Sequence, residues 1–361
     1  MKYTTLLFLL AFTTAGAFAA DVISQQRFVR IMPIYQRWDL QQNNQFSEVS
    51  FPLQVYLPLS RNLSATLLGS QASVSGEALQ SLSGLTDTQL SFNYHLEGPK
   101  LMLSLGINLP SGKTELTQDE FVTSNVISLN ILNLQVPNFG QGWNISPGLT
   151  WAVPVQENFV LGLGAAYQYK GAFKPLTGLS ADYNPGDEIL LTGGFDLRLS
   201  PTAVFTSDVI FTLYGTDNYA DSEVFTAGNK LVANFQFRQY FDYDELWLLA
   251  RYRSRGKNDV AVAGQLVTES VKTSPNQIEV LGHYRRRFSR QVSVRFLAEG
   301  RFYQETPAFE GVNLFGGGLA PIISLSPSFQ LLAQFKYFTG SFKSGDSLSG
   351  VEAGLGAVVN F

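Results

Sequence analysis

Cysteine is absent from this sequence of 361 residues, and histidine occurs only twice. Without cysteine the chain has no disulfide scaffold, no thiolate metal site and no lipid-modified cysteine of a lipoprotein. Charged residues make up 15%, against a quarter in an average soluble domain. The net charge of −4 gives no electrostatic reason to bind nucleic acid. Nowhere is there an apolar run of the roughly 20 residues that a membrane-spanning helix needs.

Catalytic patterns are also scarce. His95 and His283 lie on separate predicted strands, each just before a short turn, whereas an enzyme that hydrolyses outer-leaflet lipid would need its histidine near the opposite rim with a serine beside it. The SGKT sequence of residues 111–114 lacks the glycine of a phosphate loop, because Ile107 stands at that position. We therefore expect no enzymatic activity, no cofactor and no bound metal. A barrel enzyme that acts on lipid remains an alternative.

The N-terminus has the features of a secretory signal peptide. Lys2 is followed by an apolar run at residues 6–12, and Ala17 and Ala19 frame a cleavage site. We expect residues 1–20 to be removed and residues 21–361 to form one domain, since no linker or change of composition divides them.

Most of the remaining sequence alternates between apolar and polar residues. Leu101, Leu103, Leu105, Ile107 and Leu109 form one such row. Alternation with a period of two is the signature of a strand with one apolar face. Similar rows recur along the chain, each about as long as the 9–11 residues with which a tilted strand crosses a bilayer. Other rows lie at residues 49–59, 90–96, 143–153, 159–169, 189–199, 231–237 and 329–337.

The connections between the rows alternate in length. Tight turns occur at residues 60–62, 97–100, 156–158, 200–202, 241–245, 288–290 and 326–328. Longer polar connections occur at 40–46, 71–86, 110–141, 171–187, 215–229, 256–275, 305–311 and 341–347. Short periplasmic turns and long outer loops are typical of bacterial outer-membrane barrels. The predicted fold is an all-β, antiparallel up-and-down transmembrane β-barrel of 14–16 strands. The lower number holds if 28–38 or 312–325 is not a strand.

The last residues continue the alternation to a terminal aromatic, with Val359 and Phe361 on the apolar face. This ending resembles the C-terminal assembly signal of Gram-negative outer-membrane β-barrels. The resemblance implies insertion into the outer membrane by the barrel-assembly machinery, with help from periplasmic chaperones. Outer-membrane lipids and lipopolysaccharide would then surround the protein.

One predicted face of four consecutive strands is rich in arginine. The opposite parity is apolar there, so these side chains should face a lumen. A channel wall whose charges all have one sign attracts ions of the opposite sign, and arginine can bind carboxylate or phosphate with two parallel hydrogen bonds. In one alternative interpretation the arginines pair with acids and only maintain the shape of the barrel. In another, some arginines at strand ends bind lipopolysaccharide phosphates from outside. The candidate pore-lining residues are Arg238, Arg251, Arg253, Arg255, Glu279, His283, Arg285, Arg295, Glu299 and Arg301.

The longest connection, residues 110–141, joins the fifth and sixth predicted strands. It begins with polar residues and continues with the apolar sequence VISLNILNLQVPNF. An apolar segment in an exposed loop should become buried. We expect it to fold into the lumen and narrow or close it, as the constriction loop of general porins does from the same position. An extended hairpin or a helix on the rim is the alternative.

Residues 104–116 (SLGINLPSGKTEL) resemble strand ends in the outer-membrane transporter family of phenol-degradation pathways, the MetA-type channels. Taken together, these features predict an outer-membrane channel for passive passage of small solutes, anionic or organic-acid solutes among them. A channel for hydrophobic or aromatic compounds is the first alternative. A lipid-modifying enzyme and a structural barrel with a blocked lumen are the others.

Overall fold

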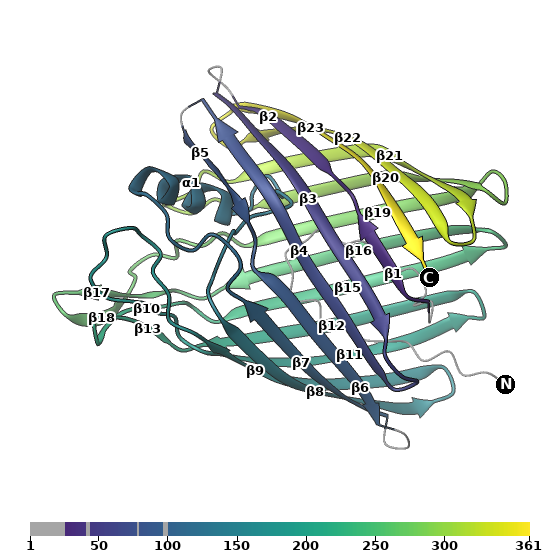
Figure 1. The fold of residues 1–361 in the computed structure, drawn as a ribbon, viewed down its shortest axis with the longest axis horizontal. Helices are drawn as coiled ribbons and strands as arrows, with labels where there is room; N and C mark the ends of the chain where they lie inside the picture. Colours follow the sequence, from purple (N-terminus) through teal and green to yellow (C-terminus); the bar gives the residue numbers. More distant parts are fainter. Residues whose placement is uncertain (1–25, 41–43, 78, 97–99) are drawn as a thin grey trace.

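A computed structural model describes residues 26–40, 44–77, 79–96 and 100–361. Sixteen antiparallel strands form a closed barrel, in which each strand pairs with its sequence neighbours and the last pairs with the first (Figure 1). The prediction of an up-and-down barrel is confirmed, at the upper end of the predicted strand number. The predicted signal peptide, residues 1–20, lies outside the described residues.

We call each of the sixteen strand positions in the barrel wall a stave. Two staves are interrupted, so that each consists of two labelled strands, β1 with β2 and β5 with β6. In chain order the barrel strands are β1 (Phe28–Ile31), β2 (Ile34–Leu40), β3 (Asn44–Pro58), β4 (Leu63–Gly76), β5 (Leu79–Leu85), β6 (Thr88–Leu96), β7 (Leu101–Leu109), β8 (Asn144–Gln156), β9 (Phe159–Lys170), β11 (Glu188–Ser200), β12 (Ala203–Tyr214), β15 (Lys230–Phe241), β16 (Asp244–Arg255), β19 (Gln277–Arg287), β20 (Val292–Tyr303), β21 (Val312–Ser326), β22 (Phe329–Phe342) and β23 (Ser347–Asn360).

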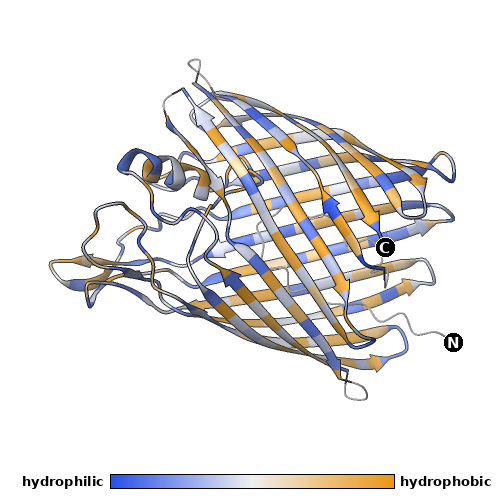
Figure 2. Cartoon of the chain, in the orientation of Figure 1, coloured by the Kyte–Doolittle hydropathy of each residue, from blue (hydrophilic) through white to orange (hydrophobic). Residues whose placement is uncertain are grey.

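The outer face of the barrel is apolar because alternate residues of each strand point away from the lumen. Leu103, Leu149 and Leu163, on three neighbouring strands, are all more than 40% exposed. Figure 2 shows alternating orange and blue positions along the strands, as expected where one face is apolar and the other polar. The predicted rows of apolar residues therefore cover the outside of the barrel.

The two ends of the barrel differ. Short turns and the C-terminus lie at one end, and the long connections lie at the other (Figure 1). The long connections contain secondary structure that the sequence did not indicate. Residues 71–76 and 79–85 continue the wall as β4 and β5, so the prediction of a polar loop at 71–86 was wrong. Serine and glycine at half of these positions had masked the alternation of Ala72, Val74 and Leu82.

Three other long connections combine into a second sheet beyond the long-loop end of the barrel. Its five strands are β10 (Tyr183–Asn184), β13 (Thr216–Tyr219), β14 (Ser222–Thr226), β17 (Asp259–Val262) and β18 (Gln265–Thr268). The connection between β7 and β8 contains the helix α1 (Gln118–Ser128). In the part of the chain that the structure describes, no helix is long and apolar enough to cross a membrane.

Candidate channel interior

The connection between β7 and β8, residues 110–141, turns into the barrel. We call it the inserted segment. It follows the fifth stave, as predicted. Its helix α1 starts at a capping box, in which the Thr117 hydroxyl accepts from the Glu120 N–H and the Glu120 carboxylate accepts from the Thr117 N–H. Lys113 also donates to Glu120 at 2.6 Å. Burial favours the neutral carboxyl, but these hydrogen bonds outweigh it and lower the pKa of Glu120.

Asp87 holds both ends of the inserted segment. This residue lies at the break between β5 and β6 and is 7% exposed. Its carboxylate accepts from the N–H of Gly112 at 2.9 Å and from the N–H of Gln141 at 2.7 Å. The Asn108 side chain donates to the same carboxylate at 2.8 Å. One buried carboxylate thus binds the start and the end of a segment of about thirty residues, which closes it into a loop.

The approach of the two ends also requires glycine at position 112. A β-carbon there would lie 2.2 Å from the Phe139 carbonyl oxygen and 2.6 Å from the Asp87 nitrogen. Both atoms belong to the backbone, so neither can move aside at low cost. Any larger residue at this position would push the ends of the inserted segment apart.

Three polar side chains of the wall bind the backbone of the middle of the inserted segment. Gln36 donates to the Asn133 carbonyl at 3.2 Å and accepts from the Gln135 N–H at 3.1 Å. Glu48 accepts from the Val136 N–H at 3.1 Å. The Tyr303 hydroxyl lies 3.3 Å from the carbonyl oxygens of Asn130 and Ile131. Residues 130–136 are therefore fixed to β2, β3 and β20, which are distant in sequence but adjacent to the segment.

Apolar side chains of the inserted segment are buried against apolar side chains of the wall. The prediction that this segment buries its apolar part holds for most of the apolar side chains at residues 126–139, which pack against the inner face of the barrel, but Val126 and Leu129 are 45% and 62% exposed. From the segment the cluster includes Leu116, Ile127, Leu134, Val136 and Phe139, and from the wall Trp38, Phe46, Val74, Leu82, Tyr303, Val312, Leu314, Phe338 and Leu348.

The predicted arginine face lies on β15, β16, β19 and β20, which are the tenth to thirteenth staves. Arg251 contacts Glu279 at 3.2 Å, and Arg253 contacts the same carboxylate at 3.7 Å. The side chain of Glu279 is 6% exposed, whereas those of Arg251 and Arg253 are 23% and 27% exposed. The guanidinium groups therefore cover the carboxylate and remain partly accessible themselves.

A second group with the same composition lies closer to the short-turn end. Arg238 and Arg285 contact Glu245 at 3.2 Å and 3.0 Å. Again the carboxylate is covered, at 4% exposure, and the arginines are 25% and 28% exposed. Glu245 was missed in the sequence because it had been assigned to the turn at 241–245. Glu245 lies an even number of positions from Trp247 and Arg251 of β16, and this spacing could have identified it as a residue of the same face.

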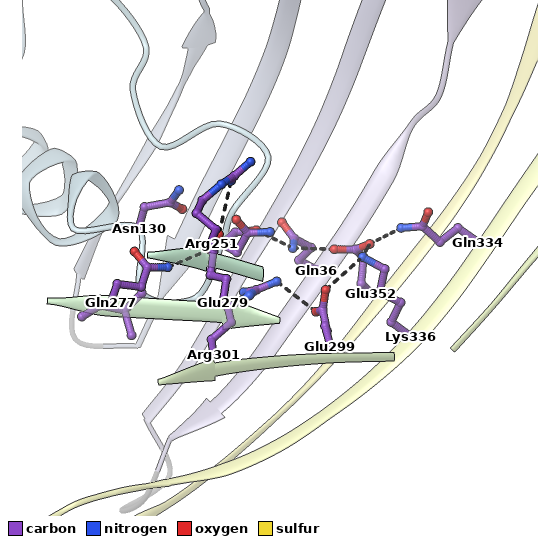
Figure 3. A network of polar contacts seen from close by, with 12 residues as sticks. Gln36, Asn130, Arg251, Gln277, Glu279, Glu299, Arg301, Gln334, Lys336 and Glu352 are labelled. Carbon is purple, nitrogen blue, oxygen red and sulfur yellow. Dashed lines mark hydrogen bonds and ion pairs between the residues drawn. The ribbon is translucent and has the colours of Figure 1, made fainter. Parts of the chain in front are cut away.

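Arg301 joins a further network that reaches the inserted segment (Figure 3). It donates to Glu299 at 2.9 Å, and Lys336 lies between Glu299 and Glu352 at 3.9 Å and 3.2 Å. Glu352 accepts from Gln36 at 2.8 Å, and Gln36 binds the segment directly. Arg301 and Glu299, both predicted site residues, are thus part of the support of the inserted segment, and Arg301 is only 2% exposed.

The remaining predicted residues occupy other places on the same four strands. Arg255 lies at the long-loop end, with its guanidinium over the ring of Tyr214. Arg295 stands directly opposite Arg285 in the pairing of β19 with β20. The ring of His283 stacks on Trp247 with centroids 5.3 Å apart.

The two histidines lie on different strands of the barrel wall. Among the residues with defined placement, no three histidine or acidic side chains are close enough to hold a metal ion together. His95 is paired with Met102 in the ladder of β6 and β7, while His283 belongs to β19.

The C-terminal residues complete the barrel wall. Val359 lies opposite Val29 of β1, and the Phe361 N–H donates to the Arg27 carbonyl at 3.0 Å. The Phe361 side chain is 63% exposed on the outside. The exposed Phe361 ring is accessible to the barrel-assembly machinery, and its role as an assembly signal remains a prediction.

No family model matches the sequence, and no curated protein matches it either. Similar solved structures have low sequence identity. An outer-membrane channel from Pseudomonas putida F1 is 10% identical, with 94% of this chain and 97% of that chain covered and a TM-score of 0.42. The monoaromatic hydrocarbon channel CymD is 10% identical, with coverages of 94% and 89% and a TM-score of 0.48. An anion-selective porin from Comamonas acidovorans is 12% identical, with coverages of 93% and 98% and a TM-score of 0.43. The solved structures to which this chain is similar thus include an outer-membrane channel, a hydrocarbon channel and a porin.

Proposed function

We propose that this protein is an outer-membrane channel for the passive passage of small anionic solutes, with organic acids among them. The apolar exterior and the alternation of short turns with long connections support a place in the outer membrane. Assembly there would involve the barrel-assembly machinery and periplasmic chaperones. Phospholipid and lipopolysaccharide would surround the barrel. The inserted segment would narrow the path, because it is held against the inner wall at its ends and in its middle.

The observation that carries this proposal is the arrangement of two arginines around one covered glutamate. It occurs twice, at Glu279 and at Glu245. The two arginines and the glutamate of each group carry a net charge of +1, with Asp208 also near Arg251, and the accessible part of each group is guanidinium. A passing anion would therefore meet positive charge, whereas a passing cation would reach the carboxylates only by displacing arginine. Partly exposed arginines act on solutes even when they also stabilise the wall.

The alternative of a channel for hydrophobic compounds has less support in this geometry. It required the apolar part of the inserted segment to be a binding surface. Leu134, Val136 and Phe139 are instead 2–3% exposed and buried against the wall. Of the large apolar side chains at residues 126–139, only Val126 and Leu129, at the start of the same apolar sequence, are exposed. A solute would have to displace the segment in order to contact the buried side chains.

Current through single channels in a planar bilayer with a salt gradient tests the proposal. We expect a reversal potential that indicates anion preference. Replacing Arg251 and Arg253 by Gln should remove or reverse that preference, because Glu279 is then uncovered. Glu279→Gln should change it in the opposite direction. Arg37→Gln is the control, because Arg37 is 42% exposed on the outer face and pairs with Asp39.

Two results would count against the proposal. A barrel that folds but conducts no current would refute passive passage and favour a structural role. A reversal potential that does not respond to the Arg251 and Glu279 changes would refute the role of the arginines.

A further inference from the structure

The short-turn end of the barrel has a group of aromatic and basic side chains on its outer face. Tyr284, Arg286 and Phe288 follow one another at every second position at the end of β19, so they share the face that is also formed by Ile278 and Val280. Ile278 and Val280 are 48% and 47% exposed, which identifies this as the apolar exterior. Arg286 therefore points away from the lumen, unlike its neighbour Arg285.

The turn between β15 and β16 adds to this group because β16 pairs with β19. Asp244 accepts from the Tyr284 hydroxyl at 2.7 Å and from the Arg287 N–H at 2.9 Å. The Arg287 guanidinium lies over the ring of Tyr243, 5.4 Å from its centroid. These contacts hold the two turns together and engage Asp244, the acidic residue that also attracts Arg286 electrostatically, in hydrogen bonds to other groups.

Arg286 itself contacts a ring instead of a carboxylate. Its guanidinium lies 5.7 Å from the centroid of Phe288; Asp244 attracts it electrostatically, but no contact of Arg286 with a carboxylate within 4.0 Å is found among the described residues. Arg37, the basic residue on the outer face at the other end, is in contrast paired with Asp39. Phe288 and Tyr243 are 59% and 72% exposed, which is unusual for aromatic side chains in water. Aromatic rings of this kind prefer the level of lipid headgroups.

We propose that Arg286 binds the phosphate of an anionic glycerophospholipid at the short-turn rim, with Phe288 and Tyr284 beside the glycerol region. Guanidinium matches phosphate oxygens with two parallel hydrogen bonds. The acyl chains would continue along the apolar wall over Leu248, Val280 and Phe296, which are all exposed on the same side. The site depends on the barrel lying in a membrane, but not on the channel being open or selective for anions.

Lipid retention measured by native mass spectrometry tests this site. Folded protein in detergent is delipidated and titrated with phosphatidylglycerol. We expect one adduct that survives activation, with an apparent affinity at least tenfold lower in Arg286→Gln. Arg61→Gln is the matched control, because Arg61 is also exposed on a short turn but has no aromatic ring contact. Arg286→Lys should retain part of the affinity. Diacylglycerol with the same acyl chains, which lacks phosphate, should not form the stable adduct.

Equal losses in the Arg286→Gln and Arg61→Gln proteins would overturn the site and leave only general charge attraction. An unchanged adduct in Arg286→Gln would also overturn it, as would tighter retention of lipopolysaccharide than of phosphatidylglycerol. Heat-dependent gel mobility confirms that each variant is folded. Conductance should be the same in Arg286→Gln as in the unaltered protein, so a failure of the channel proposal is recognised separately.

Discussion

Replacing Asp87 by Ala should release both ends of the inserted segment. The substitution removes the acceptor of three hydrogen bonds, from Gly112, Gln141 and Asn108. Hydrogen bonds to a charged partner each contribute about 1.5–3 kcal/mol. The three share one acceptor, so their contributions are not additive. We take about 3 kcal/mol for the net loss, which raises the population of detached ends roughly a hundredfold.

Trypsin cleavage after Lys113 measures this population. Lys113 lies in the first part of the inserted segment and pairs with Glu120 while the segment is in place. If the ends open and close faster than they are cut, the cleavage rate follows the fraction that is open. We expect the rate to rise roughly a hundredfold in Asp87→Ala, in proportion to that population. Single-channel traces should also contain brief states of higher conductance.

Asp119→Ala is the control for the Asp87 experiment. It removes the same charge from an exposed position in the first turn of α1, where the loss to the helix is only some tenths of a kcal/mol. Its cleavage rate should stay close to that of the unaltered protein. If Asp87→Ala remains folded and is cut no faster than Asp119→Ala, the Asp87 carboxylate does not hold the ends, and the backbone hydrogen bonds of Asp87 to Phe139 and of Lys113 to Leu85 are sufficient.

Three further outcomes are expected. Gly112→Ala should give the same fast cleavage as Asp87→Ala, because its β-carbon meets the backbone of Phe139 and Asp87; normal cleavage would show that the ends need not be so close. The pKa of Glu120 is lowered, so the stability that its carboxylate gives the capping box is complete at pH values above the ordinary pKa of 4.5 and is lost as the pH falls below it. Conductance noise should increase in that acidic range, and Glu120→Gln should abolish this pH dependence. Deletion of Phe361 should reduce assembly in cells but not refolding in detergent, since it removes one backbone hydrogen bond and an exposed ring; poor refolding would instead indicate a structural role.

The wall of this barrel could be predicted from the sequence because one physical rule governs it. An apolar exterior imposes alternation, and alternation also determines which residues point inward. The parity of Leu246 and Leu248 was enough to place Arg251 and Arg253 on the inner face. At residues 71–76 the exposed face is polar, with Gln71, Ser73 and Ser75, and the apolar side chains of Ala72 and Val74 are buried on the inner face, so the rule gave no signal and a loop was predicted instead of strands.

The support of the inserted segment could not be predicted in the same way. Gln36, Glu48 and Asp87 lie 54–99 positions away in sequence from the backbone groups of residues 133–141 that they bind. A polar residue on the inner parity of a strand has the same appearance in the sequence whether it contacts water or protein. Only the apolar character of residues 126–139 indicated that the segment would be buried.

The interrupted first stave has a consequence for the final step of barrel formation. Two-residue slips preserve the in-and-out pattern of a strand, so alternation alone does not exclude them. Pro33 has no N–H, and at this gap the Leu355 N–H donates to its carbonyl while the Met32 N–H donates to Pro52. Pro33 faces Leu355 in the register of this seam, so only one of the two hydrogen bonds that such a pair can exchange is formed even in the correct register. The seam therefore has one weak point beside the gap, and a residue with an N–H at position 33 should hold the last strand more firmly.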